Sequence, residues 1–272
     1  PYGPFAFGLA ALVIVILFSS GWFTRDQIPR LPKPAENLPK FSPLEFFGDL
    51  LKVLRNRNYL WLLIAFFFLS MMIGLRTGLN LYINTFYWEL TSEQLRWFIL
   101  GSAAGYIAGF VFAARMHRAF DKRMTMIVWA VVYSAAPALP NVLGQLGVLS
   151  PDTPGLLGIL IAISVVGYGS ASVLNITVMS ALADIADENE LRFGLRQEGV
   201  LYATRSLAAK VDQAIGALLA GLVLAWIAFP AKAVPGEVTS GVLADLARWA
   251  GLLAAGPGLS AAGVSARFAM TR

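Results

Sequence analysis

The sequence has no cysteine and a single histidine, which excludes several kinds of site. Without thiols there are no disulfides, no thiolate zinc sites and no cysteine nucleophile. One histidine, His117, cannot build a haem or multi-histidine site, and we interpret it as a solvated residue of a basic loop. The sequence also has no glycine-rich phosphate loop, no metal-ligand spacing and no nucleophile–base motif. We therefore do not expect an enzyme.

Charge is also scarce, because only 14% of the 272 residues are charged and 57% are hydrophobic. An average soluble domain is about 25% charged and about 45–50% apolar. The net charge of +5 would suit nucleic acid. However, the basic residues fall in short segments between apolar runs, as orientation signals do in membrane proteins. The composition indicates a polytopic helical membrane protein in contact with the lipid bilayer, and we expect no nucleic-acid partner.

Seven apolar stretches approach or exceed the length of about 20 residues that a membrane span needs. They cover residues 5–23, 59–88, 97–114, 124–142, 155–183, 201–229 and 248–266. No strand-like alternation competes with them. The sequence thus predicts an all-α protein with a first span in residues 1–23, a connection in residues 24–58 and a six-helix bundle in residues 59–272.

The distribution of Lys and Arg predicts the orientation. Most of the 21 basic residues lie on the side that carries the connection and the C-terminus, which places both in the cytoplasm. Pro1 then lies outside, and we expect further helices before it. Within the connection, Ser42–Glu45 reads as a capping box of an amphipathic helix on the membrane surface, either a simple connector or a lipid-binding element.

Lys210 is the strongest sign of function, because ionisable groups at membrane depth usually face a cavity or a partner. Tyr202, Ser206 and Lys210 are spaced by four and share one helix face. Lys210 lies about 13 Å beyond Leu201, where the span begins. It therefore either faces a cavity or extends its amine back to the membrane surface. Nearby polar residues favour the cavity.

Other spans also carry polar residues. Arg76 and Asn80 share one helix face. Arg76 could bind a carboxylate, a phosphate or hydroxyls of a solute, or it could pair with a carboxylate elsewhere in the protein. Asn175 suits either a ligand or a contact between helices. Arg205 and Asp212 are seven residues apart, which would also allow a structural ion pair between them.

A dense charged segment follows the fifth predicted span. Asp184 and Asp187 end that span, and Arg196 and Glu198 lie across a short loop at the start of the next. These side chains either form ion pairs that close the cytoplasmic face of a transporter or are static, solvated loop residues.

This region carries a family resemblance. The residues from Ala183 to Asp187, then Glu190, the run from Arg196 to Tyr202, and Lys210 resemble the signature of the glycoside–pentoside–hexuronide:cation symporters. These are the melibiose-permease-like branch of the major facilitator superfamily. The resemblance implies twelve helices in two halves, of which this chain would supply helix 6, the central cytoplasmic loop and helices 7–12. It departs from the family at Glu188-Asn189 and at Asp212.

The resemblance also implies roles for residues. Lys210 would lie near the cation and substrate sites, Ser206 would face the sugar, and Asp184 and Arg196 would join the gate between the halves. The coupling cation, Na⁺ or H⁺, would bind carboxylates on the N-terminal helices, outside this chain, so this chain would hold no metal or cofactor.

The expected function is cation-coupled symport of a glycoside or related small solute by alternating access, in the cell membrane. The expected binding residues are Tyr202, Ser206, Lys210, Arg76, Asn80 and Asn175, and the expected gate residues are Asp184, Asp187, Arg196 and Glu198. Two alternatives remain open at this point: a carrier of lysophospholipids or other amphipathic solutes, and a membrane scaffold that transports nothing.

Overall fold

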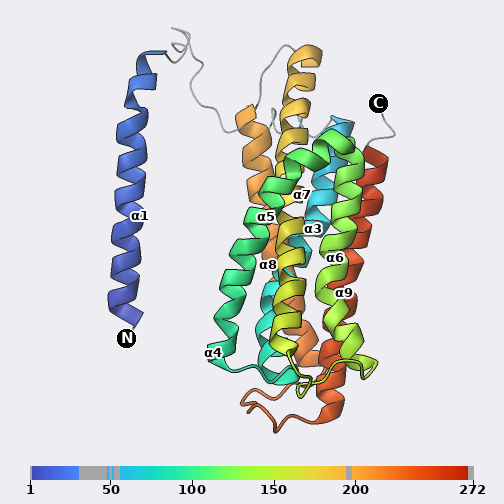
Figure 1. Ribbon diagram of the computed structural model, residues 1–272. Helices are drawn as coiled ribbons and strands as arrows, with labels where there is room; N and C mark the ends of the chain where they lie inside the picture. The colour runs from blue at the N-terminus through green and yellow to red at the C-terminus, as the bar shows by residue number, and fades with distance from the viewer. Residues whose placement is uncertain (1, 31–47, 49–50, 52–55, 194–197, 269–272) are drawn as a thin grey trace. The chain divides into compact units, whose positions relative to one another are not determined.

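The computed structural model describes residues 2–30, 48, 51, 56–193 and 198–268, and the regular structure of these residues is helical (Figure 1). The chain divides into two units, residues 1–46 and 47–272. The first unit holds helix α1 (Tyr2–Thr24) and the 3₁₀-helix η1 (Arg25–Arg30). The capping box and amphipathic helix predicted from Ser42 onward lie outside the described residues.

The second unit is a bundle of helices. It comprises α3 (Arg57–Tyr82) with its π-helical extension η2 (Ile83–Tyr87), α4 (Ser92–Leu95), α5 (Trp97–Ala119), α6 (Lys122–Gln145), α7 (Leu156–Phe193), α8 (Glu198–Trp226) and α9 (Ser240–Phe268). The predicted all-α polytopic bundle is confirmed. Six helices, α1 included, are long and apolar enough to cross a membrane. The predicted seventh span lies within α9, whose glycine, serine and proline residues lower its hydropathy and which packs along α3 and α6.

Several helix ends differ from the prediction, most clearly in α7 and α9. The fifth predicted span continues as α7 to Phe193, so the acidic residues after Ala183 are helical and not in a loop. This end of α7 extends past the neighbouring helices (Figure 1). The last helix begins at Ser240, before the predicted start at Arg248.

The helix contacts reveal two related halves within the bundle. Helix α3 packs against α8 and α9, α7 packs against α5 and α6, and α6 packs against α9. In this pattern α3, α5 and α6 correspond to α7, α8 and α9. The contact of α3 with α8 matches that of α7 with α5, and the contact of α3 with α9 matches that of α7 with α6. The contacts are therefore those of two three-helix repeats, which the sequence alone does not reveal.

Glycines form both of the equivalent close contacts. A Cβ at Gly109 in α5 would collide with the backbone of Gly169 in α7, and one at Gly105 would lie 2.6 Å from the Val165 carbonyl oxygen. In the equivalent pair, a Cβ at Gly74 in α3 would collide with the backbone of Gln213 in α8. Small residues at these places let the helix backbones approach each other closely.

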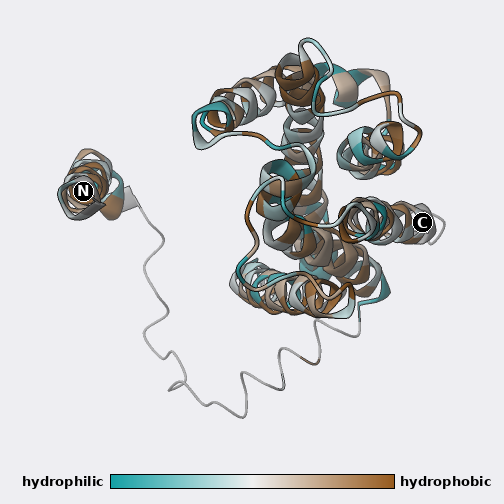
Figure 2. Cartoon of the chain, turned by 90° about the horizontal axis from the view of Figure 1, so that it is seen from below, coloured by the Kyte–Doolittle hydropathy of each residue, from teal (hydrophilic) through white to brown (hydrophobic). Residues whose placement is uncertain are grey.

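The outer surface of the bundle is apolar. Large hydrophobic side chains such as Ile107, Phe110 and Leu218 are each more than 60% exposed. In the end-on view of Figure 2, hydrophobic residues colour much of each helix. Such a surface is unfavourable in water and suits lipid contact.

Candidate functional site

A cavity of about 450 Å³ lies among α3, α5, α6, α7 and α8. Its apolar walls come from residues such as Phe66, Leu69 and Ile73. Its polar lining consists of Ser70, Arg76, Thr77, Asn80, Tyr106, Tyr133, Tyr168, Asn175, Arg205, Ser206, Lys210 and Gln213. A mainly apolar cavity with a few convergent polar groups is typical of a small-molecule site.

The structure brings together five of the six predicted binding residues, because Arg76, Asn80, Asn175, Ser206 and Lys210 all line this cavity. Helical spacing places Arg76 and Asn80 on one face of α3, and Ser206 and Lys210 on one face of α8. Tyr202 lies one turn before Ser206, is 36% exposed and is not among the lining residues. The binding roles of these residues remain predictions.

Tyrosine rings surround the Arg76 guanidinium. Its Cζ lies 5.2 Å from the ring centroid of Tyr133 and 6.0 Å from that of Tyr168. The Tyr168 ring is itself 5.6 Å from the ring of Tyr106. These cation–π contacts hold a charged, planar donor at the cavity wall. The sequence does not mark Tyr106 and Tyr133 as lining residues, because nothing in their spacing shows which face of α5 or α6 turns inward.

Arg205 is a second guanidinium at the cavity. Its Nη2 donates a hydrogen bond to Asn175 Oδ1 at 3.3 Å, and its Cζ lies 4.3 Å from the Phe66 ring centroid. The considered ion pair between Arg205 and Asp212 is wrong, because Asp212 Oδ2 and Arg205 Nε have no hydrogen-bond partner among the described residues. Asn175 makes the helix-to-helix contact and also lines the cavity, so both of its proposed roles fit its position.

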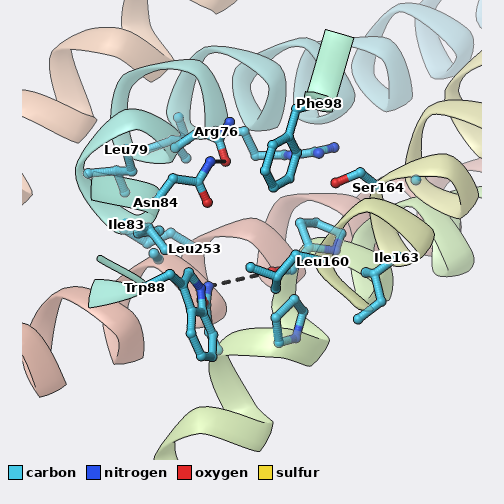
Figure 3. Close-up of a pocket in the computed structure, with 17 residues that line it drawn as sticks. Arg76, Leu79, Ile83, Asn84, Trp88, Phe98, Leu160, Ile163, Ser164 and Leu253 are labelled. Atoms are coloured by element: carbon cyan, nitrogen blue, oxygen red, sulfur yellow. Dashed lines mark hydrogen bonds between the residues drawn. The ribbon is translucent and has the colours of Figure 1, made fainter. Parts of the chain in front are cut away.

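A smaller cavity of about 70 Å³ adjoins Arg76 and Asn80, among α3, α5, α6, α7 and α9 (Figure 3). Asn84 donates to Asn80 Oδ1 at 3.4 Å and lines this cavity together with Asn141. The volume suits a few water molecules and is too small for a sugar. Arg76 and Asn80 thus line both cavities.

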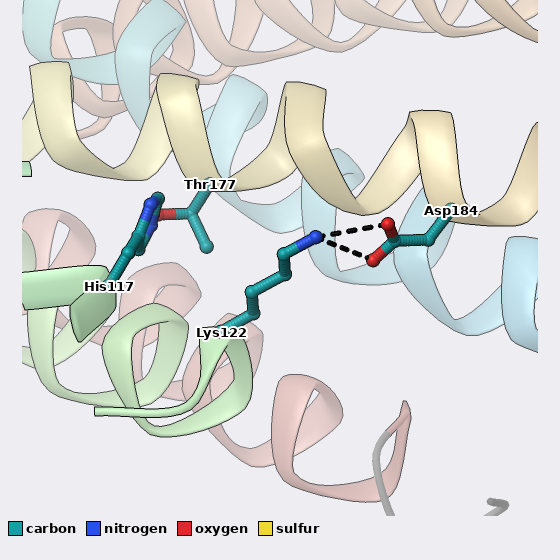
Figure 4. Close-up of polar contacts among 4 residues, drawn as sticks. All are labelled: His117, Lys122, Thr177 and Asp184. Carbon is teal, nitrogen blue, oxygen red and sulfur yellow. Dashed lines mark hydrogen bonds and ion pairs between the residues drawn. The ribbon is translucent and has the colours of Figure 1, made fainter. Parts of the chain in front are cut away.

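Asp184 pairs with a lysine of a neighbouring helix, and both side chains remain partly exposed. Lys122 Nζ, at the start of α6, lies 2.8 Å and 3.0 Å from the two carboxylate oxygens of Asp184 on α7 (Figure 4). Asp187 is exposed and Glu198 is half-buried in the first turn of α8. Arg196, the expected partner across the loop, lies outside the described residues. The gating roles remain predictions.

The expectation that His117 is a solvated loop residue is wrong. His117 lies in the last turn of α5, and its Nε2 is 2.8 Å from the buried Thr177 hydroxyl of α7 (Figure 4). The helix continues through the basic residues because no glycine or proline interrupts them.

The departure from the family pattern at Glu188-Asn189 has a structural role. Asn58 donates to both carboxylate oxygens of Glu188, at 3.0 Å and 3.1 Å. Asn56 donates to Asn189 Oδ1 at 2.7 Å, and both side chains are buried. These bonds fasten the end of α7 to the start of α3.

The comparisons with known proteins agree with this fold and cavity. A family described as "MFS/sugar transport protein" matches residues 2–262. The chain belongs to this family. It is 27% identical over 235 residues to an uncharacterized symporter of Synechocystis, which covers 85% of this chain and 40% of the relative. It is 25% identical over 216 residues to an isoprimeverose transporter of Lactiplantibacillus pentosus, with 79% of this chain and 42% of the relative covered. The chain therefore spans about two fifths of the length of these curated relatives.

Both relatives are transporters by their names, and the family resemblance suggested by the residues from Ala183 to Lys210 is consistent with the family match. The family and these relatives support transport over enzymatic activity, in a multi-pass membrane protein with a small-molecule solute.

Proposed function

We propose that this chain is the C-terminal half of a cation-coupled sugar symporter and that its 450 Å³ cavity forms half of the sugar site. The observation that carries the proposal is the lining of this cavity, where tyrosines stand beside Arg76, Asn175 and Lys210. A sugar has apolar ring faces that stack on aromatic rings, and hydroxyls that accept and donate hydrogen bonds. The family match and the isoprimeverose transporter among its relatives support a sugar as the solute.

The second half of the site would come from an N-terminal six-helix half. Ser206, Lys210 and Gln213 line the cavity but are exposed in this chain, in the middle of a helix that is apolar enough to cross the membrane. A lysine exposed to lipid at that depth is costly. A second half that encloses a water-filled cavity removes this cost.

In this proposal the two halves rock around the sugar by alternating access, in the cell membrane with the C-terminus in the cytoplasm. Asp184 and Asp187, with Arg196 and Glu198, close the cytoplasmic side. The coupling cation, Na⁺ or H⁺, raises the affinity for the sugar, and by reciprocity the sugar raises the affinity for the cation by the same factor.

The first test is the thermal stability of the complete transporter, screened with sugars, glucuronides and lysophospholipids, each with and without sodium. We expect one glycoside to raise the unfolding temperature, because only a ligand that binds the native state does so. Stabilisation by lysophospholipid alone would instead favour an amphipathic-solute carrier. Absence of any stabilisation and of any uptake would favour a scaffold.

Lys210→Ala tests the site itself. We expect this variant to lose coupled uptake into proteoliposomes, because it removes the one ammonium that the described residues place at the cavity. Lys232→Ala is the matched control, since Lys232 is exposed in the connection between α8 and α9. Unchanged accumulation by Lys210→Ala would remove this lysine from the mechanism.

A further inference from the structure

Asp212 is a buried carboxylate that the proposed sugar site does not use. It lies in the middle of α8 and is 2% exposed. Its Oδ2 has no hydrogen-bond partner among the described residues. Residues of this chain alone bury the Asp212 side chain, so its burial does not require the N-terminal half. An ionised, unpaired carboxylate is costly in such a place, whereas the neutral acid costs far less.

A second unpartnered polar group lies on the facing helix. Ser70 of α3 is fully buried and its Oγ has no hydrogen-bond partner. Thr125 Oγ1 of α6 is likewise buried without a partner among the described residues, whereas several other helical hydroxyls donate to the carbonyl four residues earlier. Those of Ser134, Ser170, Thr177, Thr204 and Ser260 do so at 2.6–3.0 Å. Ser70 has the same option and does not use it in this structure.

Helix register places Ser70 and Asp212 at the same level of the contact between α3 and α8, where their polar atoms do not bond each other. Helices α3 and α8 run parallel, since Tyr59 bonds the Leu201 carbonyl at 3.1 Å and Gly78 contacts Ala220 further along. Gly216 packs on the backbone of α3 between Met71 and Leu75. Asp212 is one turn before Gly216 on the same face, so it meets the turn of α3 that contains Ser70, within about one helical turn.

No charged group of the cavity bonds Asp212 Oδ2 among the described residues. The titratable side chains that α3, α7 and α8 contribute to the cavity are Arg76, Tyr168, Arg205 and Lys210. Arg76 contacts tyrosine rings, and Arg205 contacts Phe66 and Asn175. Asp212 is not a lining residue, but Gln213, the next residue, is. The buried carboxyl is therefore one residue away from the lining of the cavity.

We propose that Asp212 is a proton-binding site of the transport cycle, within this half of the protein and at the level of Ser70 in the contact between α3 and α8. The inference rests on the proposed function and adds a site to the cation site expected in the N-terminal half. In the enclosed state the carboxyl is neutral; when the cavity reopens, the proton passes to water and leaves a carboxylate. A divalent cation is a poor occupant, because Ca²⁺ and Mg²⁺ take about six or more oxygen ligands and the described residues contain no group of three acidic, cysteine or histidine side chains that could hold a metal ion.

The test is Asp212→Asn in the complete transporter, reconstituted in proteoliposomes with an internal pH dye. The amide imitates the neutral acid and cannot release a proton. With one proton per sugar, a pH difference of about one unit supports about tenfold accumulation, since 1.4 kcal/mol corresponds to a factor of ten. We expect Asp212→Asn to lose this accumulation and the sugar-driven pH change, while sugar exchange without a gradient stays within about twofold of wild type. Glu237→Gln, at an exposed acid outside the helices, is the matched control and retains both.

Three outcomes separate the proposals. Normal accumulation with normal proton movement in Asp212→Asn overturns the proton site. Wild-type uptake that depends on sodium and moves no protons also overturns the proton site. That result leaves the symporter proposal intact. Absence of any sugar transport in wild type overturns the proposed function. If Asp212→Asn does not fold, Asp212→Glu decides: a shifted pH midpoint of uptake supports the site, and an unchanged midpoint contradicts it.

Discussion

At the scale of single residues, the planar guanidinium of Arg76 lies at the cavity wall beside the rings of Tyr133 and Tyr168. Arg76→Lys keeps the charge but replaces the fork of donors by a single ammonium. A hydrogen bond to a charged group contributes about 1.5–3 kcal/mol, so we expect the affinity for the sugar to fall by about tenfold or more. Isothermal titration of the purified complete transporter measures this change.

The control for Arg76→Lys is Arg96→Lys. Arg96 is 61% exposed and pairs with Glu93 at 3.3 Å, outside the cavity. We expect no change in affinity there. If the two variants bind sugar equally well, Arg76 has a structural role beside the tyrosines and does not contact the solute.

Single residues also show how far sequence patterns reach. The shared face of Ser206 and Lys210 follows from their spacing by four, and the structure places both at one cavity. The contact between Arg205 and Asn175 does not follow, because it depends on how α7 and α8 approach each other. Spacing within one helix is a local property, whereas partners across helices depend on tertiary packing.

At the scale of helices, the glycines of α5 determine how closely it approaches α7. A Cβ at Gly109 would collide with the Gly169 backbone and lie 2.7 Å from Ser172 Cβ, neither of which is a flexible side-chain end. We expect Gly109→Ala to destabilise the protein by about 1–3 kcal/mol, the usual cost of overpacking. Thermal unfolding of the purified protein measures this effect.

Gly221→Ala is the matched control for Gly109→Ala. Gly221 is a helical, exposed glycine of α8 with open space around its Cβ position. Alanine there should be neutral or stabilising by up to about 1 kcal/mol, because it favours the helix. Equal unfolding temperatures for the two alanine variants would show that the close contact between α5 and α7 is not needed.

The start of α3 provides a second test at this scale. Asn56 accepts from the backbone amides of Asn58 and Tyr59 and donates to the buried Asn189. Asn56→Ala removes a cap worth about 1 kcal/mol and leaves a buried acceptor unpaired at a cost of about 1–3 kcal/mol. We therefore expect a loss of about 2 kcal/mol or more, measured as a fall in the unfolding temperature.

Asn56→Asp separates the two contributions. The carboxylate keeps the cap, and the Asn189 Nδ2, which has no partner in this structure, can turn to donate to it. The loss should be clearly smaller than for Asn56→Ala. Equal losses would mean that the amide donated by Asn56 dominates and that the cap contributes little.

Helix ends show why some elements could not be predicted. The acidic residues after Ala183 indicate a loop by their charge, but no glycine or proline occurs before Gly194, and α7 continues to Phe193. The contact of Glu188 with Asn58, 130 residues away, holds this extension. Local composition predicts the apolar spans well, whereas long-range contacts determine where the helices end.

At the scale of the whole molecule, helix α8 has one face that lines the cavity and another, apolar face that is exposed on the outside of the bundle. Ser206 lines the cavity, while the next residue, Leu207, is 64% exposed on another face and does not line it. Since this chain has no cysteine, Ser206→Cys and Leu207→Cys each add one thiol to an otherwise thiol-free segment. We expect a membrane-impermeant maleimide to label Ser206→Cys in the complete transporter, and the sugar to slow this labelling.

Leu207→Cys should remain unlabelled in the membrane, because the reactive thiolate forms in water and not in lipid. Both cysteines should react after denaturation, which controls for expression and reagent. The contrast between two adjacent residues reports the environment of the helix faces and not the depth of the residues in the bilayer. Equal labelling of both, unaffected by sugar, would mean that this face of α8 borders no enclosed solute pathway, which would contradict the proposal that a second half completes the cavity.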